Sequence, residues 1–291
     1  MRTGKTTIRI LTLLISLLSS MYIVSSLEEN NFPITPSLDD SVLPDDFEFN
    51  ASNGFLQNSK DKKDKKDKVA PGPGPGITDY DFYVFSLGWS PAYCLTVDTK
   101  DCYAKLNALK DAYIMRIHGL WPSLKNGGRL PDCHTGTEIE VDPKLDAEPY
   151  LTMTEIWPSL NKNHQYNFWT HEYNKHGYCY SAKYQKASYV PFFQTTVDLF
   201  AKQDFAPLMK KAFPSQPGVD VKTTYNEIIR KFAQVTGQEY FELICKTIKG
   251  GAQLLTEVRF YFDLDFNTMT GFKYHTNCQL DKEITIVYHN K

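Results

Sequence analysis

The chain has 291 residues, a formal net charge of −2 at pH 7 and a pI of about 6.4. This length suits one or two domains, and 42% hydrophobic residues is typical of a globular protein. The near-neutral charge argues against tight binding to duplex nucleic acid, but it is compatible with a nuclease that grips one or two nucleotides locally.

Residues 1–26 have the pattern of a secretory signal peptide. Arg2, Lys5 and Arg9 precede an apolar run over residues 10–24, and small residues follow it. An uncleaved signal anchor is the alternative, although this run is shorter than the roughly 20 residues that a membrane span needs. We therefore expect a protein of the secretory pathway that carries no membrane anchor.

Residues 27–76 are predicted to be a low-complexity tail and linker. A mixed Lys/Asp run covers residues 60–68, and a Pro-Gly repeat covers residues 71–76. The run could serve as a phosphate-binding arm, but its interleaved Asp residues cancel most of the charge. Asn50 begins the sequence's one N-glycosylation sequon. A single domain is expected over residues 77–291.

Strand and helix periods both occur in this domain, without βαβ alternation. Residues 116–122 are interpreted as a strand end that runs into a turn, and residues 254–262 and 284–288 alternate as strands do. Helices are expected over residues 149–160, 168–176, 192–203 and 225–236, the last with a Thr224…Glu227 capping box and a stop at Gly237. This pattern predicts an α+β fold with a central antiparallel sheet and packed helices.

All six cysteines follow the linker. An even number of cysteines behind a signal peptide indicates three disulfides formed in an oxidising compartment. The sequence alone leaves fifteen connectivities open for Cys94, Cys102, Cys133, Cys179, Cys245 and Cys278.

Two short segments about fifty residues apart carry the candidate chemistry: His118–Pro122 and Trp169–Gly177. Residues of an α-helix advance by about 100°, so the polar side chains of the second segment fit one arc of a helix that Gly177 would end. A solvated helix face is the plain alternative. Three histidines, a carboxylate and an ammonium, flanked by aromatic rings, could move protons around a phosphodiester without a metal.

A zinc-protease site is a weaker interpretation. That motif places its two histidines four residues apart, whereas His171 and His176 are five apart, and no third ligand lies nearby in sequence. We expect no metal and no other cofactor. The remaining histidines have no motif around them and are interpreted as structural or surface residues: His134, His164, His275 and His289.

The two segments resemble the signatures of the ribonuclease T2 family of acid endoribonucleases. The first signature, HGLWP, is intact at residues 118–122, and the second, close to WxHEWxKHG, has only Tyr173 in place of Trp. The resemblance covers roughly residues 80–280 and includes residues 87–94 and 156–160. The family fold agrees with the α+β prediction.

The resemblance implies cleavage of single-stranded RNA, in which the 2′-OH attacks phosphorus and a 2′,3′-cyclic phosphate forms before hydrolysis to a 3′-phosphate. An in-line displacement needs a base and an acid on opposite sides, which suits histidines from separate segments. The resemblance implies these roles: His176 as base, His118 as acid, Glu172 and Lys175 as stabilisers of the phosphorane, His171 as a phosphate ligand and Trp121 as a base-stacking platform.

The resemblance also selects the disulfides Cys94–Cys102, Cys133–Cys179 and Cys245–Cys278. The second bridge would pin the end of the catalytic helix to the loop that follows Trp121. We expect a monomer that is extracellular or resides in a lysosome or vacuole. An inactive RNA-binding or storage protein of the same fold stays the alternative, and a general hydrolase is disfavoured because no activated Ser or Cys nucleophile is evident.

Overall fold

The computed structural model describes residues 77–125, 130, 132–134, 136–142, 148–161, 165–271 and 276–289. The expected signal peptide, the tail and the sequon at Asn50 lie outside these residues, as do His164 and His275. The helices and strands, in chain order, are β1 (Phe82–Trp89), α2 (Ser90–Val97), α3 (Lys100–Ala108), β2 (Met115–Ser123), α4 (Tyr150–Ile156), α5 (Gln165–Glu172), η2 (Tyr173–Gly177), α6 (Tyr178–Lys183), α7 (Val190–Lys202), α8 (Leu208–Ala212), β3 (Val221–Thr223), α9 (Tyr225–Thr236), β4 (Phe241–Thr247), β5 (Gln253–Phe262) and β6 (Ile284–Ile286).

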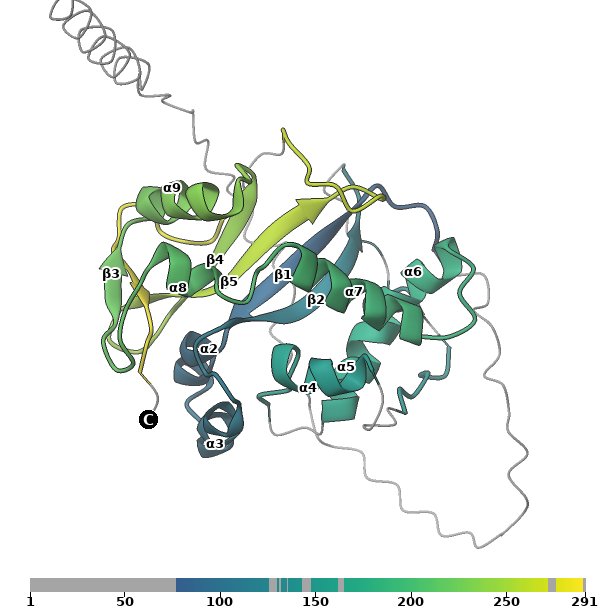
Figure 1. Cartoon of the computed structure of the whole chain (residues 1–291), viewed down its shortest axis with the longest axis horizontal. Coiled ribbons are helices and arrows are strands. Elements are labelled where there is room, and N and C mark those ends of the chain that lie inside the picture. Colours follow the sequence, from purple (N-terminus) through teal and green to yellow (C-terminus); the bar gives the residue numbers. More distant parts are fainter. Residues whose placement is uncertain are drawn as a thin grey trace, which may run out of the picture. The chain divides into compact units, whose positions relative to one another are not determined.

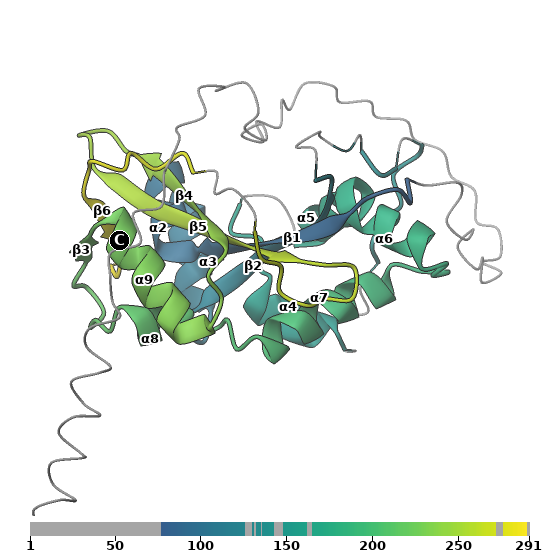
Figure 2. The same ribbon diagram turned by 90° about the horizontal axis from the view of Figure 1, so that it is seen from above.

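One sheet organises the described part of the chain. Its strand order is β2-β1-β5-β6-β3, and β4 pairs with the other edge of β5. The pairings are antiparallel except for a short parallel contact between β5 and β6. Helices α4 to α7 lie near β2, whereas α8 and α9 lie beside β3 and β4 (Figures 1 and 2). The predicted α+β class, with a sheet and packed helices, is confirmed, and the sheet is mixed at this one place.

The two faces of the central strands differ in chemistry. Alternate residues of β1 and β5 are apolar and fully buried, and Phe205 stacks on Phe260 with ring centroids 4.5 Å apart. The intervening positions carry Ser86, Glu257 and Arg259. Because side chains of a strand alternate between faces, one face of the sheet belongs to the core and the other can hold polar groups.

Strand β2 differs from its prediction. The expected turn within residues 116–122 is wrong, because the strand continues to Ser123 and Pro122 pairs with Tyr83 of β1. Proline cannot donate to a strand ladder, but β2 ends the strand order of the sheet and tolerates it there. The whole first motif therefore belongs to an edge strand.

The expected helix stop at Gly177 is also wrong. Gly177 has helical backbone angles, φ −67° and ψ −25°, and the chain passes from α5 through the π-helix η2 into α6. A π-turn forms where the amide of Tyr178 donates to the carbonyl of Tyr173. Gly177 is required for space, because a Cβ there would clash with the rings of Phe192 and Tyr173.

Helix α9 begins and ends as predicted. The Thr224 side chain accepts a hydrogen bond from the amide of Glu227, and Gly237 ends the helix with a positive φ of 69°. A left-handed residue of this kind is a common helix terminator. Among the described residues, we find no helix whose length and apolar character would let it cross a bilayer.

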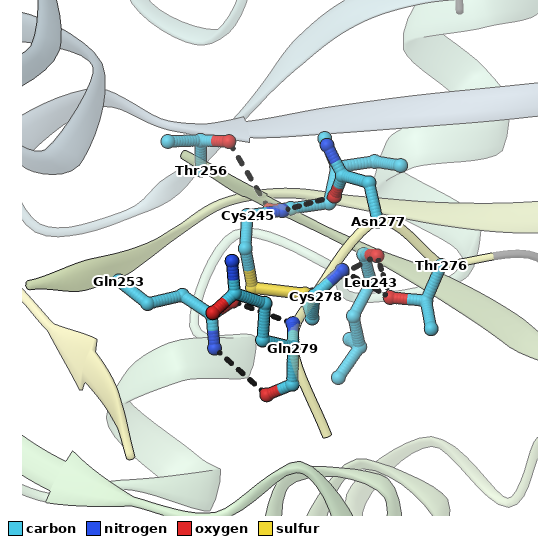
Figure 3. Close-up of a disulfide and its surroundings, with 9 residues drawn as sticks. Leu243, Cys245, Gln253, Thr256, Thr276, Asn277, Cys278 and Gln279 are labelled. Atoms are coloured by element: carbon cyan, nitrogen blue, oxygen red, sulfur yellow. Dashed lines mark hydrogen bonds between the residues drawn. A yellow bond between two sulfur atoms is a disulfide. The ribbon is translucent and has the colours of Figure 1, made fainter. Parts of the chain in front are cut away.

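The three disulfides join the pairs that the resemblance implies: Cys94–Cys102, Cys133–Cys179 and Cys245–Cys278. Figure 3 shows the last bridge, which holds the segment before β6 against β4. The Asn277 side chain accepts from the amide of Cys245 at 2.8 Å, and Thr276 donates to the carbonyl of Leu243 at 2.6 Å. Polar contacts thus reinforce this bridge.

Candidate active site

A β-bulge sets the position of His118. Gly119 of β2 pairs with Ser86 and Ile117 pairs with Leu87, so His118 is the extra residue between two regular pairs. A bulge turns a side chain out of the normal alternation. His118 thereby joins Trp121 on the polar face of the sheet, with ring centroids 5.1 Å apart, although residues three apart in a regular strand face opposite ways.

Trp121 lies at the centre of the site. Its indole N–H donates to Oε2 of Glu172 at 3.1 Å, and its ring centroid is 5.4 Å from that of His176. The guanidinium of Arg259 lies 5.2 Å from the Trp121 ring centroid. One indole therefore contacts residues of both motifs and of β5. Stacking of an RNA base on Trp121 stays a prediction. The ring also lies against the imidazoles of both His118 and His176, so its position helps to set the distance between them.

Gly119 allows this close approach. A Cβ at Gly119 would overlap Oε2 of Glu172 and the indole of Trp121. Glycine is therefore required inside the first motif for reasons of space.

Trp157 links the two motifs through the backbone. Its indole N–H donates to the carbonyl of His118 at 2.9 Å, and its own carbonyl accepts from the indole of Trp169 at 2.9 Å. Trp157 and Trp169 are both fully buried. Because a buried indole N–H needs a partner, this chain of bonds ties the bulge in β2 to helix α5.

The π-helix that carries Lys175 and His176 is held by Cys133, His134 and Ile139. The amides of Cys133 and His134 donate to the carbonyls of Lys175 and Asn174, at 3.2 and 3.1 Å. The Asn174 side chain exchanges two 2.9 Å hydrogen bonds with the backbone of Ile139. Together with the bridge Cys133–Cys179, these bonds fix the second motif from outside the helix.

The α-helical arc expected for the second motif holds only through Glu172. His171 and Glu172 end α5, whereas Lys175 and His176 lie in η2, where the wider turn changes the angle between successive residues. Glu172 is buried, at 2% exposure, so the solvated-face interpretation fails for this carboxyl. Tyr173 and Asn174, which follow Glu172, are buried as well.

His118 is bonded to a carboxylate that the motifs do not contain. Its Nδ1 lies 2.8 Å from Oε1 of Glu257, and the His118 side chain is 36% exposed. Burial opposes protonation of this imidazole, but the negative charge and hydrogen bond of Glu257 outweigh burial and raise its pKa. His118 is therefore stabilised as an imidazolium, the form that a general acid requires.

The pKa values of Glu172 and His171 are shifted in the directions that favour their neutral forms. Burial raises the pKa of Glu172 to about 7, although His118, the Trp121 indole and Lys175 oppose this change. Burial, helped by the charges of Lys175 and His118, lowers the pKa of His171 to about 4. At a mildly acidic pH, Glu172 is thus a neutral carboxylic acid and His171 a neutral imidazole, and both can donate hydrogen bonds to phosphate oxygens.

The structure also places residues at the site that sequence reasoning missed. Phe168 stacks on His118 with ring centroids 6.2 Å apart, and Glu257 and Arg259 come from β5. The signal for the last two was two charges on alternate positions of an otherwise apolar strand. Of the remaining described histidines, His134 bonds the carbonyl of Thr137 and His289 pairs with Asp220, both outside the site.

Within the described residues, no group of three or more His, Cys, Asp or Glu side chains is arranged to hold a metal ion. What the site does contain is a stabilised imidazolium, a second imidazole, a protonatable carboxyl and the ammonium-bearing residue Lys175. Such a set can transfer protons and stabilise a phosphorane.

Comparisons with known proteins agree with this chemistry. A model of the Ribonuclease T2 family matches residues 80–278. Ribonuclease 3 of Arabidopsis thaliana is 34% identical over 115 residues, which are 38% of this chain and 49% of that protein. The ribonuclease T2 protein rnst-2 of Caenorhabditis elegans is 30% identical over 151 residues, 51% of this chain and 52% of that protein. The chain thus spans about half the length of these two relatives.

Solved structures share the fold. Ribonuclease MC1 from bitter gourd seeds superimposes with a TM-score of 0.55 at 23% identity, covering 69% of this chain and 98% of that one. RNase NT in complex with 5′-AMP gives a TM-score of 0.57 at 24% identity, with 73% and 100% covered. At these identities the likeness shows the fold alone.

Proposed function

Because the chain belongs to the ribonuclease T2 family, we propose that it is a metal-independent endoribonuclease that cleaves single-stranded RNA. The observation that carries this proposal is the position of His118 and His176. They come from separate elements and both lie against Trp121, with ring centroids 5.1 and 5.4 Å from it. Two imidazoles at one site can serve as the base and the acid of an in-line displacement.

In the first step, His176 takes the proton of the RNA 2′-OH while the 2′-oxygen bonds to the adjacent phosphorus. The bond from phosphorus to the 5′-oxygen breaks, and His118 gives its proton to that leaving oxygen. A 2′,3′-cyclic phosphate and a free 5′-OH result. The assignment of His118 as the acid is supported by its raised pKa, which keeps the imidazole protonated.

In the second step the roles exchange. Neutral His118 takes a proton from water as the water oxygen bonds to phosphorus, and His176 protonates the departing 2′-oxygen to leave a 3′-phosphate. The phosphorane of each step carries extra negative charge on its equatorial oxygens. Lys175 stabilises this charge, and neutral Glu172 and His171 donate hydrogen bonds to the same oxygens.

We place the enzyme in the secretory pathway, outside the cell or in a lysosome or vacuole, acting as a monomer on RNA. The three disulfides support an oxidising compartment. An inactive RNA-binding or storage protein stays the alternative. Burial of the Glu172 carboxyl at the indole of Trp121 costs free energy, and such a cost is easier to explain if the carboxyl takes part in catalysis.

One assay tests the proposal. The purified protein is incubated with single-stranded RNA and with single-stranded DNA of the same sequence, each with and without EDTA. We expect cleavage of RNA only, unaffected by EDTA, with 2′,3′-cyclic phosphate ends that later become 3′-phosphates. Binding of RNA without cleavage would favour the storage protein, and loss of cleavage in EDTA would indicate a metal enzyme.

A further inference from the structure

A carboxylate outside both motifs contacts the proposed acid. Oε1 of Glu257, on the central strand β5, lies 2.8 Å from Nδ1 of His118, which is 139 residues away in sequence. The Glu257 side chain is 19% exposed and that of His118 is 36% exposed. The contact is therefore a partly buried pair, which solvent screens less than a surface pair.

Other side chains fix this carboxylate in place. Ser86 of the neighbouring strand donates to Oε2 of Glu257 at 2.9 Å, and the guanidinium of Arg259 lies 3.2 Å from the same oxygen. Arg259 is itself within 3.6 Å of Glu242 and covers the ring of Trp121. Glu257 thus has partners on both oxygens, and its orientation is set before any substrate arrives.

The contacts also set the ionisation of Glu257. Burial opposes ionisation, but His118, Arg259 and Ser86 outweigh it and lower the pKa of Glu257 well below its usual range. An ionised carboxylate only accepts hydrogen bonds, so the proton between the two groups belongs to Nδ1 of His118. The opposite ring nitrogen, Nε2, is left to exchange protons with the substrate.

We propose that Glu257 is a positioning residue for His118, which fixes the imidazole through Nδ1–H so that Nε2 carries the transferred proton. The inference rests on the proposed role of His118 as the acid. Glu257 does not touch the RNA in this arrangement. It orients the ring, selects one tautomer of neutral His118 for the second step, and stabilises the imidazolium needed in the first.

The other charges around His118 come from the packed elements. Arg259 of β5 and His171 and Glu172 of α5 act on it electrostatically. Arg259 opposes protonation of His118, and Glu172 is neutral when the pH is below its own pKa of about 7. Glu257 is therefore the ionised carboxylate that supports the imidazolium under mildly acidic conditions.

The test compares two substitutions at Glu257 with one matched control. Glu257→Gln keeps a carbonyl that can accept from Nδ1–H but removes the charge. Glu257→Asp keeps the charge beside Arg259 but shortens the side chain by one methylene, away from His118. The control is Asp220→Asn, because Asp220 bonds Nδ1 of His289 at 2.9 Å and these side chains are 28% and 37% exposed.

We expect both Glu257 variants to lower kcat about 10- to 100-fold, the size of effect found when a metal-bound histidine loses the carboxylate that orients it, with a smaller change in KM. In Glu257→Gln the alkaline limb of the kcat profile should also move to lower pH. Asp220→Asn should leave kcat and the alkaline limb of its pH profile unchanged. Circular dichroism and the melting temperature identify a variant that has not folded. If Glu257→Gln does not fold, kcat of Glu257→Asp still tests the proposal.

A second readout does not depend on catalysis. The proton on Cε1 of His118 is followed by NMR through a pH titration, and its midpoint should fall in Glu257→Gln but not in Asp220→Asn. An unchanged midpoint, or a wild-type kcat in Glu257→Asp, would overturn the proposal. If the wild-type protein does not cleave RNA and the midpoint still falls, the positioning contact stands and the proposed function fails.

Discussion

At the scale of single residues, His171 and Glu172 are neighbours whose ionisation moves in opposite directions. Burial lowers the pKa of His171 to about 4 and raises that of Glu172 to about 7. Between these two pH values both side chains are neutral, although the sequence reads as a cation beside an anion. A site that binds phosphate gains from this, because a neutral carboxyl donates a hydrogen bond where a carboxylate would repel the substrate.

The two proposed proton carriers can be tested separately. We expect His118→Ala and His176→Ala each to lower kcat by about 10²–10⁴-fold, because each removes one of the two groups of a general acid–base pair. Steady-state cleavage of a short RNA measures this, with folding checked by circular dichroism. His289→Ala serves as the control, because His289 belongs to neither motif and pairs with Asp220. The smallest effect expected is ~10²-fold. If either variant keeps a rate within about tenfold of wild type, the role assigned to the histidine that it replaces is wrong.

Glu172 should control binding above neutral pH. Its raised pKa means that the carboxyl is neutral below about pH 7 and becomes negatively charged as the pH rises through that value. KM for RNA should therefore rise above pH 7 in the wild type. Glu172→Gln, whose amide stays a neutral donor, should flatten this rise, whereas Glu172→Ala should lose about 10²–10³-fold in kcat. A KM that rises equally in Glu172→Gln would contradict the argument.

At the scale of elements, the site depends on two departures from regular structure. The bulge at His118 and the π-helix at residues 173–177 each alter which side chains share a face. Both are held by contacts from outside the element, the first by the indole of Trp157 and the second by Cys133, His134 and Ile139. Irregular backbone of this kind is common at functional sites, where surrounding structure must stabilise it.

The bridge Cys133–Cys179 should matter for both stability and activity. Its sequence separation is 46 residues, against 8 for Cys94–Cys102, so the chain-entropy model gives about 4 and about 2.5 kcal/mol for the two bridges. Replacing Cys133 and Cys179 with Ala should lower the melting temperature and also kcat, because the contacts of Cys133 and His134 with the backbone of Lys175 and Asn174 would loosen. The Cys94/Cys102 double variant is the matched control and should keep its activity. Peptide mapping without reduction checks the pairing, and Cys179 joined to any other cysteine would contradict it.

At the scale of the whole molecule, the fold class and the meeting of the two motifs at one site could both be predicted from the sequence. Both predictions were possible because periodicity records burial and the motifs are long. Sequence reasoning missed the π-helix, because the backbone contacts that stabilise it come from Cys133 and His134, far away in sequence. It missed Glu257 for a similar reason, since the contact with His118 depends on the register of β1 against β2 and β5. Long-range register is what a one-dimensional pattern cannot supply.

Arg116 connects several elements behind the site. It is 3% exposed, and its guanidinium donates to the carbonyls of Ala112, Ile114 and Glu155 at 3.0–3.3 Å and to that of Asp111. Burial lowers its pKa to about 10, which leaves it charged at neutral pH. It thereby joins β2, two residues before His118, to the end of α4 and to the segment that precedes β2. The carbonyls it binds are part-buried, and Arg116 supplies each of them with a charged donor.

Arg116→Met should therefore destabilise the fold. Methionine fills much of the volume but donates no hydrogen bond, so several part-buried carbonyls lose a charged donor. Loss of a hydrogen bond to a charged group typically costs roughly 1.5–3 kcal/mol. Urea unfolding, followed by circular dichroism, measures the loss in the free energy of unfolding. The matched control is Arg230→Met on α9, because Arg230 pairs with Glu227 in an exposed position and should contribute little. If the two variants unfold at the same urea concentration, the hydrogen bonds of Arg116 between β2 and α4 do not stabilise the molecule.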